Sequence, residues 1–325
     1  MAHRKPPWSF DPAQWLPIDH LGDFAATAVG LQRRHLMVRQ LRDGSFLTLP
    51  AAVISDGCDG PWLVLVSGQH GNEWNGPWIL HRLVHVLDPG QIRGTTVILP
   101  IANPMAFNEG RRASLVDSID LNRTYGGRAP RKPTEHLGAI LWDSVFSRAD
   151  YLIDLHSGGP GEYLPFASAV NGNELALARA LNLPYIHTPR TTKSGFLVDT
   201  CLQSGIHAIL IEVGGGRSLD THYHAIVLDG LTNFMRTVGM LEGEPVPGPP
   251  PYVFDSKAIV PAPCAGFFHP AVELGQRVQE GQPLGAITAL LSEESVEVPS
   301  PQAGIVLYLR REPVAGEQDS LVHIV

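Results

Sequence analysis

The segment WLVLVSGQHGNEWNGPWILHRLVHVL, residues 62–87, decides the fold that we predict for this chain. Its first part, 62–68, is a short apolar run that stops at a glycine, which is typical of a strand buried on both faces. A polar turn at 69–73 follows, and apolar residues then recur at helical spacing as far as Leu87. A buried strand that leads through a polar turn into a helix is the building unit of an α/β protein.

The same form recurs along the chain as far as residue 241. Three further apolar runs predict buried strands: TTVILPIAN (95–103), ADYLIDLHSGG (149–159) and IHAILIEVGGG (206–216). Helices are predicted at 173–182 and 221–241, and residues 34–55 predict two strands around a turn at 42–44. Strands that alternate with helices predict an α/β fold, with a mixed, largely parallel sheet and helices on both faces.

Residues that can do chemistry follow three of the four buried strands. His70 and Glu73 follow the first, His156 ends the third, and Glu212 lies near the end of the fourth. Ligands of such sheets bind outside the carboxyl ends of the strands. We therefore expect these side chains to meet at one edge of the sheet.

The first three of these residues have the chemistry of a metal site. Zinc in a hydrolase needs three nitrogen or oxygen ligands and one open position. His70 and Glu73 at a strand-to-helix turn, with His156 at another strand tip, make such a set. The His70-x-x-Glu73 pattern alone is also typical of a capping glutamate and a loop histidine. Asp154 is either a hydrogen-bonding partner of a ligand histidine or an exposed turn residue.

Hydrolysis also needs a general base, and cationic side chains serve to bind a substrate carboxylate or to stabilise an oxyanion. Glu212 follows the apolar run AILI, so its desolvated carboxylate suits a general base; the alternative is a strand-end glutamate that faces solvent. Arg112 and Arg123 lie in polar loops. A guanidinium group binds carboxylate in a bidentate way and stabilises an oxyanion, whereas the alternative is a solvated basic loop.

The composition and the residue pattern of the sequence change after residue 242. The segment GEPVPGPPPYV (243–253) has five prolines, which bar a helix and a central strand. Residues 258–325 are short segments punctuated by valine and glycine, which predicts an all-β module. We divide the chain into a catalytic domain at 1–245, a proline-rich linker at 246–254 and a β module at 255–325.

The β module resembles the barrel-sandwich hybrid of biotinyl and lipoyl carrier domains. Those carriers place a modifiable lysine at a hairpin, where this chain has Glu297-Val298-Pro299-Ser300. The module's only lysine is Lys257, at its entry. We therefore predict a structural or gating module that contributes no catalytic atom.

Composition and charge narrow the class of partner. The chain has 325 residues, 44% of them hydrophobic, and a formal charge of -8, so nothing favours a nucleic-acid partner. No apolar run reaches 18 residues, and the start MAHRKPPWSF has no apolar core, which predicts neither a membrane span nor a signal peptide. Three scattered cysteines suit reduced thiols. We expect a soluble, cytoplasmic protein with a small-molecule partner; a homo-oligomer stays open.

A set of motifs resembles the succinylglutamate desuccinylase/aspartoacylase family, which has the zinc-carboxypeptidase fold. The resemblance covers roughly residues 35–241. The motifs that carry it, in the order of that family, are His70-Gly71-Asn72-Glu73, Asn103-Pro104, Arg112, Asp120-Leu121-Asn122-Arg123, Asp154-Leu155-His156-Ser157-Gly158 and Glu212-Val213-Gly214-Gly215.

This resemblance implies a role for each matching residue. It implies that one zinc ion is held by His70, Glu73 and His156, that Glu212 is general base and then general acid for metal-bound water, that Arg112 polarises the scissile carbonyl, and that Asn122 and Arg123 hold a substrate carboxylate. The implied reaction is hydrolysis of the amide bond of a small N-acyl amino acid or related N-acyl amine. The alternatives are a zinc carboxypeptidase or peptidoglycan peptidase on the same fold, and a non-catalytic binding protein.

One departure from the family pattern bears on the substrate. Residues 198–203 carry no arginine where aspartoacylases place a second carboxylate-binding one. N-acetylaspartate is therefore disfavoured. The chain looks closer to bacterial members with an added C-terminal β module, some of which deacetylate compounds similar to N-acetyl-diaminobutyrate.

Overall fold

The computed structural model describes residues 15–17, 21–41, 43–126, 129–170, 172–191 and 194–325. The N-terminal stretch in which we predict no signal peptide lies outside these residues. Across the described helices, none combines the length and the apolar character that crossing a membrane requires.

The centre of the main sheet has the predicted buried strands side by side. Its order is β3-β5-β4-β6-β9-β7, where the bounds are β3 Phe46–Ser55, β4 Trp62–Ser67, β5 Thr95–Leu99, β6 Tyr151–His156, β7 Gly161–Ser168 and β9 His207–Gly215. Strands β5, β4, β6 and β9 are parallel, whereas β3 and β7 run antiparallel on either side. The predicted mixed sheet is confirmed, with its parallel part at the centre.

Shorter strands extend the sheet at its edges. Strand β2 (Gly30–Gln40) forms the predicted hairpin with β3, and β1 (Trp15–Pro17) pairs with β2. On the other side β8 (Tyr185–His187) pairs with β7 and with β10 (Tyr252–Phe254).

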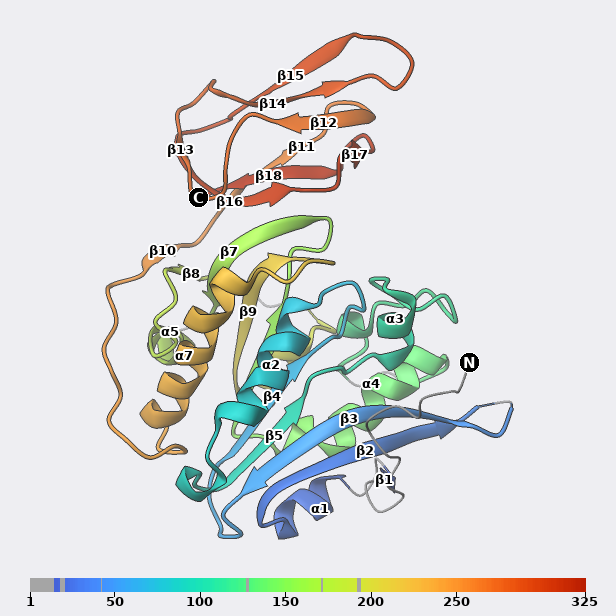
Figure 1. The fold of residues 1–325 in the computed structure, drawn as a ribbon, viewed down its shortest axis with the longest axis vertical. Helices are drawn as coiled ribbons and strands as arrows, with labels where there is room; N and C mark the ends of the chain where they lie inside the picture. The colour runs from blue at the N-terminus through green and yellow to red at the C-terminus, as the bar shows by residue number, and fades with distance from the viewer. Residues whose placement is uncertain (1–14, 18–20, 42, 127–128, 171, 192–193) are drawn as a thin grey trace, which may run out of the picture.

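Helices cover both faces of the sheet (Figure 1). The helices α2 (Asn75–Val86), α5 (Gly172–Arg179) and α7 (Thr221–Thr237) pack on one face, and α1 (Leu21–Thr27), α4 (Pro133–Ser144) and α6 (Leu197–Gln203) on the other. Strand β4 shows why its sequence is apolar throughout. Leu63 and Leu65 enter one core, while Val64 and Val66 enter the other. The remaining helical segments are α3 Pro104–Glu109 and the 3-10 turns Pro89–Gln91, Leu121–Arg123 and Phe146–Arg148.

The C-terminal part is all β, as predicted (Figure 1). Its strands are β11 Ala258–Pro261, β12 Gly266–Pro270, β13 Arg277–Val278, β14 Pro283–Thr288, β15 Ser295–Pro299, β16 Gly304–Arg310, β17 Val314–Ala315 and β18 Ser320–Ile324. The four-stranded sheet β15-β14-β12-β17 packs against β16, β18 and β11 around a separate apolar core.

The C-terminal β structure is hydrogen-bonded to the main sheet. Strand β16 pairs antiparallel with β7, and this register sets Tyr308 beside Tyr163. The Tyr163 hydroxyl lies 3.0 Å from His323 Nδ1, and the two tyrosine rings are 4.7 Å apart. The main sheet thus continues into the β module through β16 and β18. The exact domain bounds at 245 and 255 stay predictions.

We expect His323 to make the stability of this junction depend on pH. Its side chain is buried, and burial lowers its pKa to about 3, with the charge of Lys257 acting in the same direction. Its ring nitrogens lie within hydrogen-bond distance of the hydroxyls of Tyr163 and Ser320. The folded-state pKa is thus below that of the unfolded chain, about 6.5. The contribution of His323 to the free energy of unfolding is therefore fully present above pH 6.5. It falls as the pH drops, because only the unfolded chain takes up the proton.

Between pH 6 and pH 4 this group should lower the free energy of unfolding by roughly 1 kcal/mol per pH unit. Denaturant titrations of wild type and His323→Gln at pH 7, 6, 5 and 4 measure this slope. The variant should be the less pH-dependent protein, whereas replacing the exposed His269 in the same way should change nothing. Equal slopes for wild type and His323→Gln would show that His323 accepts its proton in the folded state.

Candidate metal centre and active site

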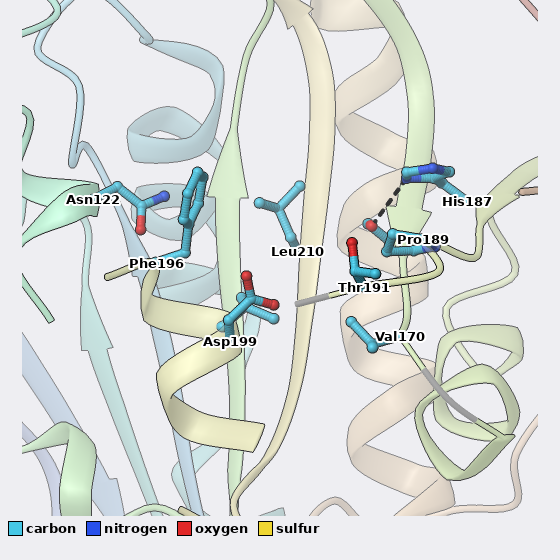
Figure 2. Close-up of a pocket in the computed structure, with 10 residues that line it drawn as sticks. Asn122, Val170, His187, Pro189, Thr191, Phe196, Asp199 and Leu210 are labelled. Atoms are coloured by element: carbon cyan, nitrogen blue, oxygen red, sulfur yellow. Dashed lines mark hydrogen bonds between the residues drawn. The ribbon is translucent and has the colours of Figure 1, made fainter. Parts of the chain in front are cut away.

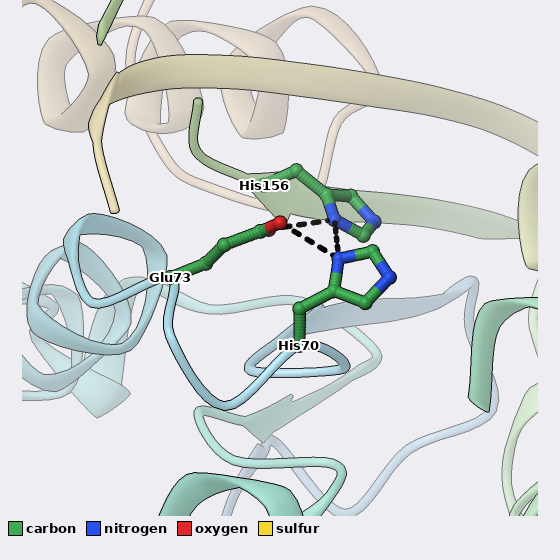
Figure 3. A group of neighbouring side chains, drawn as sticks. All are labelled: His70, Glu73 and His156. Carbon is green, nitrogen blue, oxygen red and sulfur yellow. Dashed lines mark hydrogen bonds and ion pairs between the residues drawn. The ribbon is translucent and has the colours of Figure 1, made fainter. Parts of the chain in front are cut away.

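Three predicted ligands meet where two neighbouring parallel strands end (Figure 3). His70 and Glu73 follow β4, and His156 is the last residue of β6. The Nδ1 atoms of the two histidines are 3.2 Å apart, and the Glu73 oxygens lie 2.8 Å from Nδ1 of His70 and 2.9 Å from Nδ1 of His156. All three side chains are buried. Within the described part of the chain, no other group of His, Cys, Asp or Glu converges in this way.

Carboxylates hold the far side of both histidine rings. Nε2 of His70 lies 3.0 Å from Oδ1 of Asp120, and Nε2 of His156 lies 3.0 Å from Oδ2 of Asp154. Asp154 is fully buried within β6, so the interpretation of it as an exposed turn residue is wrong. A carboxylate behind each ring sets its orientation and keeps the proton of the neutral imidazole on Nε2.

This arrangement fits a cation. With each Nε2–H directed at a carboxylate, both Nδ1 atoms present lone pairs to the same point as the Glu73 carboxylate. Acceptors that face one another in a buried site repel unless a positive charge lies among them. Burial opposes a charge on His156, but the charges of Asp154 and Glu73 raise its pKa well above the ordinary value. Two imidazoles and a carboxylate are the ligand types that zinc prefers.

The loop of His70 is held by close packing against α3. A Cβ atom on Gly71 would lie 1.9 Å from the carbonyl oxygen of Ala106, so no larger residue fits there. Asn103 caps α3 by accepting a hydrogen bond from the Ala106 N–H, and its Nδ2 donates to the Gln69 carbonyl. The Asn103-Pro104 motif therefore positions the loop of His70.

Glu212 lies on β9, where its register partner is His156 on β6. One carboxylate oxygen, Oε2, is buried and has no hydrogen-bond partner, although the residue as a whole is only partly buried. Burial raises the pKa of Glu212 to about 7; the charge of His156 opposes this shift and that of Glu73 adds to it. The carboxylate is thus desolvated, and the alternative of a strand end that faces solvent is wrong.

Arg112 lies at the rim of the cluster. Its Nη2 donates to Oδ2 of Asp120 at 2.9 Å, and its Nη1 lies 3.6 Å from Oε1 of Glu73. The side chain is half exposed. Asp120 therefore connects Arg112 to His70, and the guanidinium group lies beside the ligands with one face open to solvent.

Asn122 and Arg123 lie next to the cluster as well, and Arg123 Nη2 is 3.9 Å from the same Asp120 oxygen that Arg112 binds. Asn122 is buried, its Nδ2 is 3.3 Å from His156 Nε2, and its Oδ1 accepts a hydrogen bond from the Leu197 N–H. The Arg123 guanidinium stacks on Phe196, with Cζ 3.6 Å from the ring centroid. The amide oxygen of Asn122 is thus committed to the backbone, and only Nδ2 is left to donate to a ligand.

Two residues near the site are absent from our sequence-based interpretation. Gln69 donates through Nε2 to Asp154 and so supports His156 from behind. Gln69 directly precedes the predicted ligand His70, and this position could have indicated from the sequence that it supports the site. Tyr163 lies on β7, a strand that the sequence analysis does not predict. Pro165 interrupts that strand, and the register of β7 against β9 shifts between Tyr163 and Phe166.

The central sheet is parallel, a His-Glu-His cluster that could hold a metal ion lies at its carboxyl edge, and a desolvated glutamate lies beside that cluster. The model of the succinylglutamate desuccinylase/aspartoacylase catalytic domain matches residues 59–238, so the chain belongs to that family. The family resemblance inferred from the motifs is confirmed.

One of the curated relatives matches most of the chain, and another matches about half of it. The chain is 29% identical over 287 residues to the N-alpha-acetyl-L-2,4-diaminobutyric acid deacetylase of Halomonas elongata, which covers 83% of each protein. It is 33% identical over 175 residues to a probable aspartoacylase of a Synechococcus strain, over 47% of this chain and 52% of that protein.

Solved structures show the same fold. The product-bound ectoine utilization protein EutE (DoeB) from Ruegeria pomeroyi superposes with a TM-score of 0.82 at 26% identity, over 91% of this chain and 95% of that chain. A succinylglutamate desuccinylase/aspartoacylase from Rhodobacter sphaeroides superposes with a TM-score of 0.81 at 22% identity, over 91% and 96% of the two chains.

Proposed function

We propose that this protein is a zinc-dependent deacylase that hydrolyses the amide bond of small N-acyl amino acids. One observation carries the proposal. Two histidines whose Nε2 atoms are held by Asp154 and Asp120 turn their Nδ1 atoms toward the Glu73 carboxylate. That arrangement calls for a single cation, next to a desolvated general base.

His70, Glu73 and His156 would hold the zinc ion. When bound, zinc acts as a Lewis acid toward water and toward the amide carbonyl. Glu212, with its raised pKa, takes the proton from the attacking water and gives it to the leaving nitrogen. Arg112 reaches the rim with its guanidinium group and stabilises the negative charge that develops on the carbonyl oxygen.

Asn122 and Arg123 would bind the substrate carboxylate. Nδ2 of Asn122 is the amide group left to donate, and Arg123 is held in place by its stacking on Phe196 and by its bond to the Asn122 carbonyl. A guanidinium group that is already ordered loses less rotamer freedom when it binds a carboxylate. An N-acyl α-amino acid has a carboxylate for these two residues and, on the same α-carbon, the amide that is cleaved.

A peptide C-terminus offers the same carboxylate, so a carboxypeptidase or peptidoglycan peptidase is the second candidate. The Halomonas elongata relative, which acts by its name on an N-acetylated amino acid, favours the deacylase. Glu212 lies beside a complete set of metal ligands, and this disfavours the alternative that the chain is a non-catalytic binding protein. Cytoplasmic location, the absence of nucleic-acid and membrane partners, and the oligomeric state stay predictions from the sequence.

The test is a panel of N-acyl amino acids and dipeptides, assayed with zinc-loaded protein for release of free amine. The proposal expects turnover of N-acetyl amino acids and little or none of the dipeptides. Turnover of dipeptides alone would favour the peptidase, and no turnover of either class at one zinc per chain would contradict the proposal.

Within this panel we expect N-acetylaspartate to be a poor substrate. Residues 198–203 offer Asp199 and no arginine to a second carboxylate. An unpaired carboxylate in a partly desolvated pocket is rejected strongly, so kcat/KM should be lower by at least ~100-fold than for N-acetylasparagine, its neutral isostere. A coupled assay for acetate measures both. If N-acetylaspartate is the better of the two, another cation replaces the missing arginine.

A further inference from the structure

A pocket of about 160 Å³ has Asn122 in its wall (Figure 2). It is bounded by α6, by the ends of β7 and β8, and by Leu210 of β9. Phe196 and Val170 form apolar parts of its wall. The volume admits a side chain of a few heavy atoms.

The pocket adjoins the proposed active site at two points. Asn122 lines it and also lies 3.3 Å from His156 through Nδ2. Leu210 lies two residues before Glu212 on β9, and alternate residues of a strand point to the same face. A molecule whose carboxylate is held by Asn122 and Arg123 therefore has this pocket within reach of the substituent on its α-carbon.

One acidic side chain distinguishes the wall of this pocket. Asp199, in the first turn of α6, is 9% exposed, and Figure 2 shows its carboxylate turned toward the space between Leu210 and Thr191. Among the described residues that line the pocket, Asp199 is the only acid, and none is lysine or arginine. His187, on the far wall, lies 3.3 Å from the Ser168 hydroxyl and stacks on Phe254.

We propose that Asp199 is a specificity-determining residue that binds a primary ammonium group on the substrate side chain. This inference rests on the proposed deacylase function and names its substrate class, the N-acyl diamino acids. Asp199 also takes part in interactions within the protein. The preference for a cationic substrate that we propose depends on its negative charge and on its position in the pocket wall. A buried carboxylate favours an ammonium group over a methyl group, and it repels a second carboxylate, because Coulomb energies are large where water is excluded.

The experiment compares two ligands that differ only in the amine, Nα-acetyl-2,4-diaminobutyrate and Nα-acetyl-2-aminobutyrate. Binding is measured by calorimetry to zinc-loaded Glu212→Gln protein, which should not consume the ligand, and to Glu212→Gln/Asp199→Asn protein. We expect the first protein to bind the cationic ligand at least ~10-fold more tightly than the neutral one. The second should lose that preference while its affinity for the neutral ligand stays within a few-fold.

Turnover by zinc-loaded protein gives the second readout. Asp199→Asn alone should lower kcat/KM for the cationic substrate by ~10- to 100-fold, mainly through KM, and leave the neutral substrate within a few-fold. Asp229→Asn, the same change at an exposed position of α7, is the matched control and should alter neither. Zinc content and the thermal midpoint of each variant verify that it is folded.

An unchanged preference in the Asp199→Asn proteins overturns the inference, as does an equal loss for both ligands or a cationic ligand that does not bind. The fate of the proposed function is separate. If wild type discriminates between the ligands through Asp199 but hydrolyses neither, the binding role stands and the deacylase proposal fails. If it hydrolyses both without regard to Asp199, the deacylase proposal stands and this inference fails.

Discussion

Protein in which Glu212 is replaced by glutamine should fold and bind zinc but turn over N-acyl amino acids about 10²–10⁴-fold more slowly. The amide has nearly the shape of the carboxylate, so packing against β6 and β7 is kept. It cannot take a proton from water, however, and it cannot return one to the leaving nitrogen. The raised pKa of Glu212, to about 7, suits both transfers near neutral pH, and the glutamine variant has no such group.

The measurement is kcat for one N-acetyl amino acid, together with zinc content and thermal midpoint. Glu297→Gln, at an exposed position of β15, is the matched control and should behave as wild type. A Glu212→Gln enzyme with a rate near that of wild type would show that another group moves the proton, and it would remove Glu212 from the mechanism.

The second large effect concerns the metal centre. His156→Ala protein, dialysed against zinc-free buffer, should retain little of the one zinc per chain that we expect in wild type, and it should lose nearly all activity. Two of the three ligands would remain, and two donors do not close a tetrahedral site. His70→Ala should behave in the same way. Full zinc occupancy in both variants would refute the ligand assignment.

Asp154→Asn gives a graded version of this test. Oδ2 of Asp154 lies 3.0 Å from Nε2 of His156, and removal of such a supporting carboxylate typically weakens metal affinity by about 10–100-fold. A competition titration against a chelator measures the affinity, and His269→Ala in the β module is the control. In excess zinc the thermal midpoint of wild type should rise more than that of Asp154→Asn, because the ion stabilises only the state that binds it.

Local sequence was sufficient to predict the centre of the fold. The apolar runs that became β4, β5, β6 and β9 are buried on both faces, so their residue types alone distinguish them from the rest of the chain. His70 and Glu73 lie in the turn after β4, and His156 is the last residue of β6. Since parallel strands have their carboxyl ends at one edge, the sequence predicted that these side chains lie at that edge. That β4 and β6 are neighbours, which brings the three ligands together, is shown by the structure.

Other elements could not be predicted because their pairing is not local. Strand β7 contains Pro165, and β8 has three residues, so neither has a pattern of its own. The pairing of Tyr308 with Tyr163 joins strands 145 positions apart and carries the sheet past the proline-rich linker. A linker sequence predicts a boundary, but it holds no information on whether the parts on either side share a sheet.

The sequence by itself determined which residue types are present at the strand ends and hence the class of chemistry: two imidazoles, carboxylates and guanidinium groups. Only the tertiary structure decided which carboxylate supports which ring, that Glu212 is desolvated, and that Asp199 of α6 faces a pocket beside Asn122. The physical reason is that residue type and period are local properties of the chain. Burial, pKa and the direction of a side chain depend on neighbours that folding brings from distant segments.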